Sequence, residues 1–228
     1  MTAEGRVTGT LALVGGAEWR PGCDFDAELL ARAGGEVLVL PTAAAYERPE
    51  RAVATAQAWF ASLGGEARGL MVLSHADACE ERYASDVRSA GFVYLSGGSP
   101  LHLLSVLKGS LVLEALEAAW RAGAIVAGSS AGAMVLCDPM VDPRGGAYTV
   151  GLGLVEQVAV VPHHDSGASH HLWRTLELAP AGVAVVAIPE RTAVIREPDG
   201  KWRAAGARQS EVTVQLDGET RSLEAIPA

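Results

Sequence analysis

Residues 124 to 134 read Ala-Ile-Val-Ala-Gly-Ser-Ser-Ala-Gly-Ala-Met, an apolar run that leads into the pattern Gly128-x-Ser130-x-Gly132. A short apolar run of this kind is typical of a buried strand, and the residues after Ser130 can begin a helix. The pattern is that of a nucleophile elbow, in which a serine hydroxyl is exposed at a sharp strand-to-helix turn above a sheet. The glycines leave the room that such a turn requires. The alternative interpretation is a Gly/Ser-rich connection without a chemical role.

Further apolar runs divide the chain into alternating strands and helices. Strands are predicted over residues 10–14, 36–40, 70–73, 92–95 and 124–127, and helices over residues 24–33, 48–63, 79–90 and 111–122. Strands that are apolar on both faces and separated by helices indicate a parallel sheet with helices packed on both sides. Glycine follows each predicted helix, as expected where a helix ends.

The C-terminal part of the chain has a different pattern. Short apolar runs over residues 183–188, 192–196, 201–205 and 212–216 alternate with turn sequences such as Pro198-Asp199-Gly200. Such turns join antiparallel strands, so we expect these strands to extend the same sheet. The 228 residues contain no repeat and no long linker, and they can form one α/β domain with a large core. We therefore expect residues 1–228 to be a single domain.

The composition narrows the classes of partner. The net charge is −9 at pH 7, so a nucleic-acid backbone or an anionic membrane surface would be repelled. The three cysteines, Cys23, Cys79 and Cys137, are widely spaced and favour neither a disulfide framework nor a thiolate metal site. The first residues lack the apolar core of a signal peptide, and the longest uncharged apolar stretch, residues 122–137, is too short to cross a bilayer. We expect a soluble, cytoplasmic protein that binds neither nucleic acid nor membrane.

Small or polar residues follow several of the predicted strands. The segments directly after a strand are Gly15-Gly16, Pro41-Thr42, Gly97-Gly98-Ser99 and Ser130. In open α/β sheets, ligands bind at the carboxyl ends of the strands, so we expect these segments to lie together. A serine nucleophile also needs two donors for the oxyanion that forms, and the amides of Gly98 and Ala131 are the candidates.

A serine nucleophile requires a neighbouring base, most often histidine. His163 is the candidate because it follows the apolar run of residues 158–162 and so falls at the same edge of the sheet. His102 lies on a predicted helix and is interpreted as an ordinary helical residue. The alternative for the histidine-rich stretch of residues 163–171 is a metal site, but that stretch has no His-Glu-x-x-His pattern and no cysteine pair. We expect neither a metal nor a cofactor.

The histidine in turn needs an acid that orients it. Glu190 stands just after the apolar run of residues 183–188, at the expected edge of the sheet. Asp138 and Asp142, in the loop after the elbow helix, and Asp165, beside the histidine, are competing candidates. The residues alone favour Glu190 without excluding the other three acids.

Four segments resemble one known family in their order and spacing. They are Tyr94-Leu-Ser-Gly-Gly98, Gly128-Ser-Ser-Ala-Gly-Ala133, Pro162-His163 and Ile188-Pro-Glu190. Together they resemble the cyanophycinase and dipeptidase E (aspartyl dipeptidase) family of serine peptidases, and the resemblance extends to about Ala207. It implies a three-layer α/β/α sandwich with a flavodoxin-like, mostly parallel sheet, related to class I glutamine amidotransferase domains. It also implies a Ser130-His163-Glu190 triad with Gly98 and Ala131 as oxyanion donors, and it is compatible with a homodimer.

The sequence departs from the cyanophycinase pattern around the histidine. That pattern has Asp-Gln before the histidine and arginines after it, whereas here Val161-Pro162 precedes and residues 165–173 contain no arginine. Arg174 is then the nearest residue able to bind a substrate carboxylate. The candidate substrate contacts are Gly97, Ser99, His164 and Arg174.

The resulting hypothesis is a cofactor-free serine hydrolase that acts on small peptides as an exopeptidase or dipeptidase through an acyl-enzyme. Aspartyl and isoaspartyl peptides are among the candidate substrates. An esterase or acyl hydrolase with the same residues is one alternative, and a ligand-binding protein of this fold without turnover is another. Glutamine amidotransfer is disfavoured because that chemistry uses a cysteine where this chain has Ser130.

Overall fold

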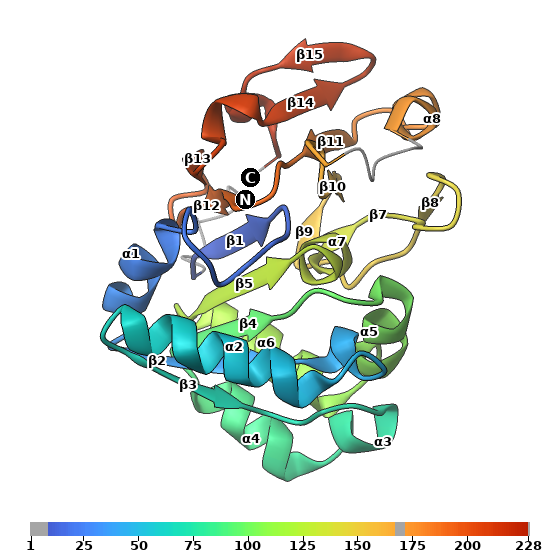
Figure 1. Ribbon diagram of the computed structural model, residues 1–228. Helices are drawn as coiled ribbons and strands as arrows, with labels where there is room; N and C mark the ends of the chain where they lie inside the picture. Colours follow the sequence, from blue (N-terminus) through green and yellow to red (C-terminus); the bar gives the residue numbers. More distant parts are fainter. Residues whose placement is uncertain (1–8, 167–171, 228) are drawn as a thin grey trace, which may run out of the picture.

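A seven-stranded sheet forms the centre of the molecule (Figure 1). The structure is a computed structural model and describes residues 9–166 and 172–227. The strands, in the order in which they lie side by side, are β13 (Trp202–Gly206), β12 (Thr192–Arg196), β1 (Leu11–Val14), β5 (Ile125–Ser129), β4 (Phe92–Leu95), β2 (Glu36–Leu40) and β3 (Glu66–Gly69). The run from β1 to β3 is parallel, and β12 and β13 add an antiparallel hairpin beside β1.

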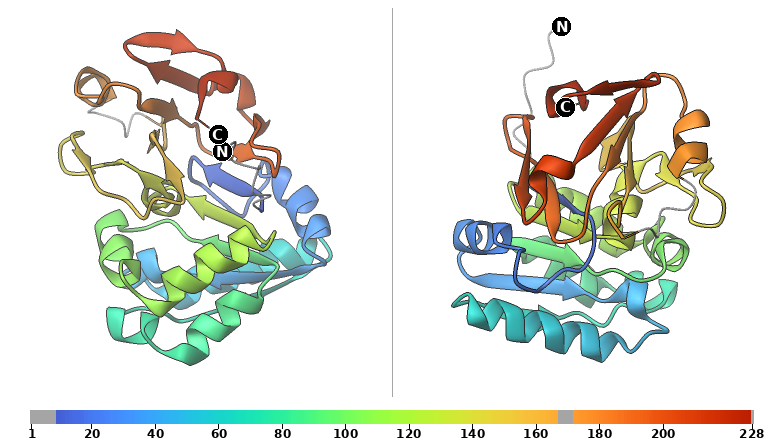
Figure 2. Two further views of the ribbon diagram at one scale, coloured as in Figure 1. Left: turned by 180° about the vertical axis from the view of Figure 1, so that it is seen from behind. Right: turned by 45° about the horizontal axis from the view of Figure 1, so that its top comes forward.

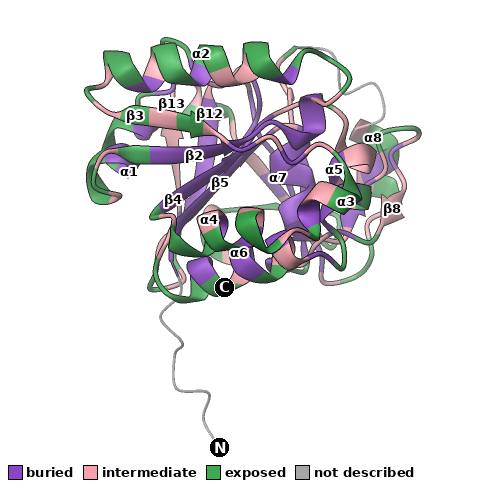
Figure 3. Cartoon of the chain, turned by 90° about the horizontal axis from the view of Figure 1, so that it is seen from below, coloured by how far each residue is buried: buried purple, intermediate pink, exposed green. Residues whose placement is uncertain are grey.

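Helices cover both faces of this sheet, which gives three layers (Figure 3). One face carries α1 (Phe25–Arg32) and α2 (Pro49–Ser62). The other carries α3 (His75–Ala78), α4 (Glu81–Ser89), α5 (Pro100–Leu107), α6 (Leu111–Arg121) and α7 (Ala131–Leu136). Alternate residues of a strand enter opposite cores: Leu11 and Leu13 face the second group of helices, and Ala12 and Val14 face the first. The expected α/β fold with a mostly parallel sheet is confirmed.

The spacing of apolar residues fixes how each helix attaches. Along α6 the buried residues Val112, Ala115, Leu116 and Ala119 recur at intervals of three and four. The hydroxyl of Ser110 accepts a hydrogen bond from the Leu113 N–H and so caps the start of the helix. Since a fully buried aliphatic side chain contributes about 1.5–3 kcal/mol, such faces hold the layers together.

A second sheet stands against the helix α7 side of the first (Figure 2). It consists of β10 (Val158–Val161), β11 (Ala184–Ala187), β14 (Thr213–Leu216) and β15 (Glu219–Arg221), with β10 and β11 parallel and the others antiparallel. Two-residue strands pair nearby as β6 (Cys137–Asp138) with β9 (Val155–Glu156) and β7 (Met140–Val141) with β8 (Tyr148–Thr149). The remaining helical elements are α8 (Leu172–Glu177) and the 3₁₀ turns η1 (Thr42–Ala44), η2 (Gln209–Glu211) and η3 (Leu223–Ala225).

The structure corrects three details of the sequence prediction. Only the hairpin β12-β13 extends the central sheet, because β11 pairs with β10 and then with β14 in the second sheet. The strand expected over residues 70–73 is replaced by β3, an edge strand whose sequence Glu-Ala-Arg-Gly has no apolar run. The helix expected over residues 79–90 is α4, and it is preceded by a short helix that the sequence did not predict, α3, which begins at a capping box formed by Ser74.

One carboxylic acid lies inside the core between α1, α2 and the sheet. Asp26 is fully buried, and its Oδ2 accepts a hydrogen bond of 2.9 Å from Trp59 Nε1. Its Oδ1 is buried and has no hydrogen-bond partner among the described residues. Burial raises the pKa of Asp26 to about 8, against the lowering effect of the Trp59 hydrogen bond. The folded state therefore favours the protonated carboxyl.

We predict that Asp26→Asn becomes progressively more stable than the parent protein as pH rises from 5 to 8. Folding raises the pKa of Asp26, so the protonated carboxyl contributes to the free energy of unfolding of the parent. This contribution is complete below the pKa that Asp26 has in the unfolded chain, and it is lost as the pH rises toward the pKa in the folded protein. Asparagine keeps an acceptor for Trp59 and does not titrate. The difference in unfolding free energy, measured by urea denaturation at each pH, should shift by about 1 kcal/mol or more. A difference that is the same at both pH values would show that Asp26 is ionised in the folded protein.

Candidate active site

Ser130 occupies a strained turn between the central strand β5 and helix α7. Its backbone has φ +49° and ψ −105°, a region that residues other than glycine rarely adopt and that costs about 1–3 kcal/mol. The Ser130 N–H donates to the Val14 carbonyl of β1 at 2.9 Å, and the Ser130 carbonyl accepts from the Met134 N–H at 3.0 Å. Both neighbours of β5 in the sheet, β1 and β4, end beside it. The sharp strand-to-helix turn expected from the sequence is therefore present.

The glycines around Ser130 are required by close backbone contacts. A Cβ atom on Gly128 would lie 2.5 Å from the backbone carbon of Gly132, and a Cβ on Gly132 would lie 2.5 Å from the carbonyl oxygen of Leu95. Side chains at either position would push α7 away from β4 and β5. The Gly-x-Ser-x-Gly spacing thus serves the packing that holds the serine in its turn.

His163 follows β10 and bridges Ser130 and Glu190. His163 Nε2 lies 2.9 Å from Ser130 Oγ, and His163 Nδ1 lies 2.8 Å from Glu190 Oε1. The His163 backbone, at φ +54°, donates from its N–H to the Gly15 carbonyl at 2.8 Å. A Cβ on Gly16, which has φ +116°, would lie 2.2 Å from Cε1 of the imidazole, so only glycine fits behind the ring. The sequence-predicted residues 130, 163 and 190 thus form one continuous hydrogen-bonded chain.

The other candidate acids have different partners. Asp138 accepts a hydrogen bond from the Gly151 N–H, and Asp142 binds Arg144, which lowers the pKa of Asp142 to about 2. Asp165 accepts from the Glu190 N–H at 2.8 Å and forms an ion pair with Arg208.

Asp165 nevertheless contributes to the site through the backbone. Partial burial acts to raise the pKa of its carboxyl, but the hydrogen bonds from the Glu190 amide and the Arg208 guanidinium outweigh burial, so the pKa is lowered. An ionised Asp165 holds the Glu190 backbone by a charge-assisted hydrogen bond. Asp165 thus fixes the segment whose own side chain contacts the imidazole.

Two backbone amides without a protein acceptor among the described residues belong to residues beside Ser130. Gly98 and Ala131 both line the same cavity as Ser130. Neither N–H donates a hydrogen bond within residues 9–166 and 172–227. Gly98 has φ +136°, and a Cβ there would lie 2.3 Å from the Ala43 carbonyl oxygen, so the loop after β4 packs tightly on η1. These are the two amides that the sequence indicated as oxyanion donors.

Glu18 is a residue of the site that the sequence interpretation missed. Its Oε1 accepts a hydrogen bond of 2.9 Å from the Gly97 N–H, and its Oε2 accepts one of 2.7 Å from Ser129 Oγ. One carboxylate therefore joins the loop after β1 to the loop after β4 and to the end of β5. The signal available in the sequence was an acidic residue just after Gly15-Gly16, at the strand edge where the other candidates gather.

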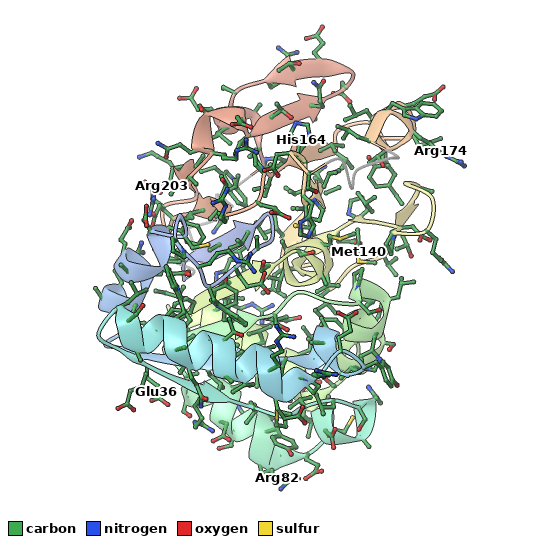
Figure 4. The ribbon with its side chains drawn as sticks, viewed as in Figure 1. Glu36, Arg82, Met140, His164, Arg174 and Arg203 are labelled. Carbon is green, nitrogen blue, oxygen red and sulfur yellow. The ribbon has the colours of Figure 1, made fainter. Side chains whose placement is uncertain are left out.

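The four candidate substrate contacts are placed in different ways. The Gly97 N–H is bound to Glu18, and Ser99 Oγ caps α5 by accepting from the His102 N–H at 3.3 Å. His164 and Arg174 line neither cavity that contains Ser130. Arg174 is exposed and points outward from α8 (Figure 4). Of the four, only Gly97 borders a cavity that reaches the serine.

Two cavities adjoin Ser130. The first, here called the apolar cavity, has a volume of about 240 Å³ and is lined by Met134, Val141, Val161, Pro162 and Leu172 among others. The second, here called the arginine groove, has a volume of about 560 Å³ and is lined by Arg20, Arg48, Arg51, Glu18 and Glu47 among others. Gly98, Ser130 and His163 line both. The loop after the elbow helix supplies one wall of the apolar cavity, through Val141, Asp142, Pro143 and Gly146.

Residues 9–166 and 172–227 contain no group of three or more side chains arranged to hold a metal ion. His170 and His171, part of the alternative metal cluster considered from the sequence, lie outside the described residues. Within the described part of the chain, no helix has both the length and the apolar character needed to cross a membrane.

Known proteins resemble this chain in sequence. It is 28% identical over 159 residues to a cyanophycinase from Trichormus variabilis, which covers 64% of this chain and 53% of the relative. It is 29% identical over 148 residues to a cyanophycinase from Synechococcus elongatus. This match covers 60% of this chain and 46% of the relative. The chain thus spans about half the length of these relatives.

Known structures resemble it along almost its whole length. A peptidase from an acI-B1 Actinobacterium has a TM-score of 0.79 and 28% identity, covering 96% of this chain and 98% of the other. A protein assigned as a peptidase E from Listeria monocytogenes EGD-e has a TM-score of 0.63 and 19% identity, and the match covers 92% of this chain and 98% of the other. At this identity the likeness shows the fold alone. The family model for peptidase family S51 matches residues 13–201. The chain therefore belongs to peptidase family S51.

Proposed function

We propose that this chain is a serine peptidase in which Ser130 is the nucleophile, His163 the general base and Glu190 the acid that orients it. One observation carries the proposal: the hydrogen-bonded chain from Glu190 Oε1 to His163 Nδ1 and from His163 Nε2 to Ser130 Oγ, at 2.8 and 2.9 Å. These distances are within the range that proton transfer from serine to histidine requires. Membership of peptidase family S51 supports the same assignment.

The mechanism follows from these positions. His163 Nε2 takes the hydroxyl proton as Ser130 Oγ attacks the carbonyl carbon of the scissile bond. The amides of Gly98 and Ala131 stabilise the negative oxygen of the tetrahedral intermediate, to which each donor typically contributes about 3 kcal/mol. The protonated imidazole, stabilised by Glu190, then protonates the leaving amine. A water molecule, activated by the same histidine, hydrolyses the acyl-enzyme and restores Ser130.

The proposed substrates are small peptides cut by a single domain that comprises residues 1–228. Ser130 is reached through cavities of about 240 and 560 Å³, which suit short peptides. Exopeptidase or dipeptidase action is the form of this activity that we propose, with aspartyl and isoaspartyl peptides among the substrates to be assayed. Ester substrates belong in the same assay, because an acyl-enzyme mechanism can also hydrolyse esters.

Replacing the nucleophile should abolish activity without unfolding the protein. We predict that Ser130→Ala lowers kcat for any cleaved peptide by about 10³-fold or more and abolishes labelling by a fluorophosphonate probe, read by intact-protein mass spectrometry. The melting temperature should not fall, because the substitution removes only the hydroxyl. Ser62→Ala, at an exposed serine near the end of α2, is the matched control and should label like the parent. A parent protein that is inert to the probe would instead support a ligand-binding protein without turnover.

Replacing the orienting acid tests the second link of the chain. A glutamine at position 190 can donate its amide to His163 Nδ1 and so favour the tautomer that cannot accept the serine proton. We predict that Glu190→Gln lowers kcat by about 10³–10⁴-fold with a small change in KM. Glu219→Gln, at an exposed glutamate of β15 that is paired with Arg221 and lines neither cavity, is the matched control and should retain full activity. An unchanged rate in Glu190→Gln would refute the role given to this residue.

Glu18 should act as a positioning residue for the proposed oxyanion donors. It holds the Gly97 N–H and so fixes the neighbouring Gly98 amide, while its second oxygen fixes Ser129 beside the nucleophile. We predict that Glu18→Ala lowers kcat about 10–100-fold with little change in KM, and that Glu18→Gln recovers part of this loss because its amide oxygen still accepts from Gly97. A role confined to stability would instead lower the melting temperature of Glu18→Ala and leave kcat at low temperature unchanged.

A further inference from the structure

The two cavities that meet at Ser130 differ sharply in chemistry. The apolar cavity is built from α7, β7, the end of β10 and α8. The arginine groove is built from the loop after β1, η1 and the first half of α2. A substrate whose carbonyl carbon is held at Ser130 has space on both sides, because Gly98, Ser130 and His163 line both cavities. Its two ends therefore meet different surroundings.

The three arginines of the groove have no side-chain partner among the described residues. Arg20, Arg48 and Arg51 are exposed, and their side chains make no hydrogen bond or ion pair within the described ranges. Most other described lysines and arginines are paired with carboxylates, namely those at positions 32, 68, 82, 88, 121, 144, 201, 203, 208 and 221. In a chain of net charge −9, three unpaired cations beside one groove are a local exception.

The acidic residues of the groove carry charges of their own, but within the described part of the chain none of them is paired with these arginines. Both oxygens of Glu18 accept hydrogen bonds, from Gly97 and Ser129, and Glu190 is bound to His163. Glu47 is the remaining carboxylate among the groove's described lining residues, and it is exposed at the rim. A guanidinium binds a carboxylate through two parallel hydrogen bonds, so the groove suits an anionic group.

The apolar cavity suits an uncharged side chain instead of an anionic group. Its volume of about 240 Å³ is below that of a typical drug-sized site and fits one side chain rather than an extended ligand. The one acidic side chain in its lining, Asp142, is already bound to Arg144. A substrate carboxylate placed there would lose water without gaining a cation among the lining residues, which is costly.

We propose that the natural substrates are small peptides with an apolar side chain on one side of the scissile bond and a free carboxylate on the other. The apolar side chain occupies the cavity beside Met134 and Val141, and the carboxylate binds Arg48, Arg51 and Arg20. The carboxylate is either the C-terminus of the peptide or an acidic side chain. This inference rests on the peptidase function proposed above, and it disfavours peptides that are acidic on both sides of the bond.

A matched peptide set tests the proposal. The value of kcat/KM is compared for five peptides: Leu-Ala, Leu-Ala-amide, Leu-Asp-amide, Asp-Leu-amide and Asp-Asp-amide. Leu-Ala has a C-terminal carboxylate and Leu-Ala-amide has none. The other three carry a side-chain carboxylate after the scissile bond, before it, or on both sides. We expect the best mixed peptide to exceed both Leu-Ala-amide and Asp-Asp-amide at least tenfold. Leu-Ala against the mixed amides distinguishes a terminal carboxylate from a side-chain carboxylate. Equal rates for all five peptides, or no cleavage of any, would overturn the proposal.

Variants of the groove test whether its arginines cause the preference for a carboxylate. In the double variant Arg48→Gln/Arg51→Gln, the advantage of the carboxylate-bearing peptide over Leu-Ala-amide should fall at least tenfold, mainly through KM. Arg121→Gln, at an exposed helical arginine outside both cavities, should keep it. Leu172→Asp, at the partly buried edge of the apolar cavity, should lower kcat/KM for leucine peptides about tenfold. A double variant that keeps the full preference would also refute the proposal.

Fluorophosphonate labelling separates this inference from the proposed function. The probe reports only whether Ser130 is nucleophilic, and the groove variants should label as fast as the parent. Labelling of the parent together with a flat peptide profile would refute the substrate class and leave the peptidase assignment intact. A parent that neither labels nor cleaves any peptide would refute both.

Discussion

Three consecutive carbonyl groups at the end of β1 hold the segments that carry the proposed triad. The Val14 carbonyl accepts from the Ser130 N–H at 2.9 Å, the Gly15 carbonyl from the His163 N–H at 2.8 Å, and the Gly16 carbonyl from the N–H of Arg191, next to Glu190, at 2.8 Å. These segments come from β5, β10 and β11, which belong to two different sheets. Each such hydrogen bond contributes only about 0.5–1.5 kcal/mol, but together they fix three side chains against one strand end.

This arrangement explains why backbone strain gathers around the site. Ser130, His163 and Arg191 have φ values of +49°, +54° and +57°, and Ala17 and Trp19 in the loop after β1 have +52° and +57°. Each such residue costs about 1–3 kcal/mol and persists only where the surroundings determine its conformation. Here the surroundings are the two cores on either face of the sheet, whose side chains in β1 and β5 are almost fully buried. The stability of the layers thus maintains a geometry that the local chain does not favour.

The sequence predicted the parts of the molecule that depend on local pattern. Ser130 was evident because its apolar strand, glycines and helix are contiguous, and β2 and β4 were evident because they are apolar on both faces. The second sheet was not predicted, because pairing β11 with β10 instead of with the central sheet is decided by tertiary packing. Glu18 was missed for the same reason, since its partners Gly97 and Ser129 are distant in sequence. Glu190 was favoured over three aspartates by its place after a strand and by family resemblance, and the structure gives those aspartates other partners.

Since backbone carbonyls fix the proposed triad, the surrounding loops are free to differ in the groups that they present beside it. The cyanophycinase pattern carries arginines after the histidine, whereas residues 165–173 of this chain have none. The arginines that line a cavity with Ser130 instead come from the loop after β1 and from the start of α2. Arg48, just before α2, has φ +62°. Asparagine or glycine would be less strained in this conformation, so the backbone does not explain why the residue is an arginine. Positive charge beside the proposed nucleophile thus comes from the loop after β1 and the start of α2, while the cavity next to α8 is mostly apolar.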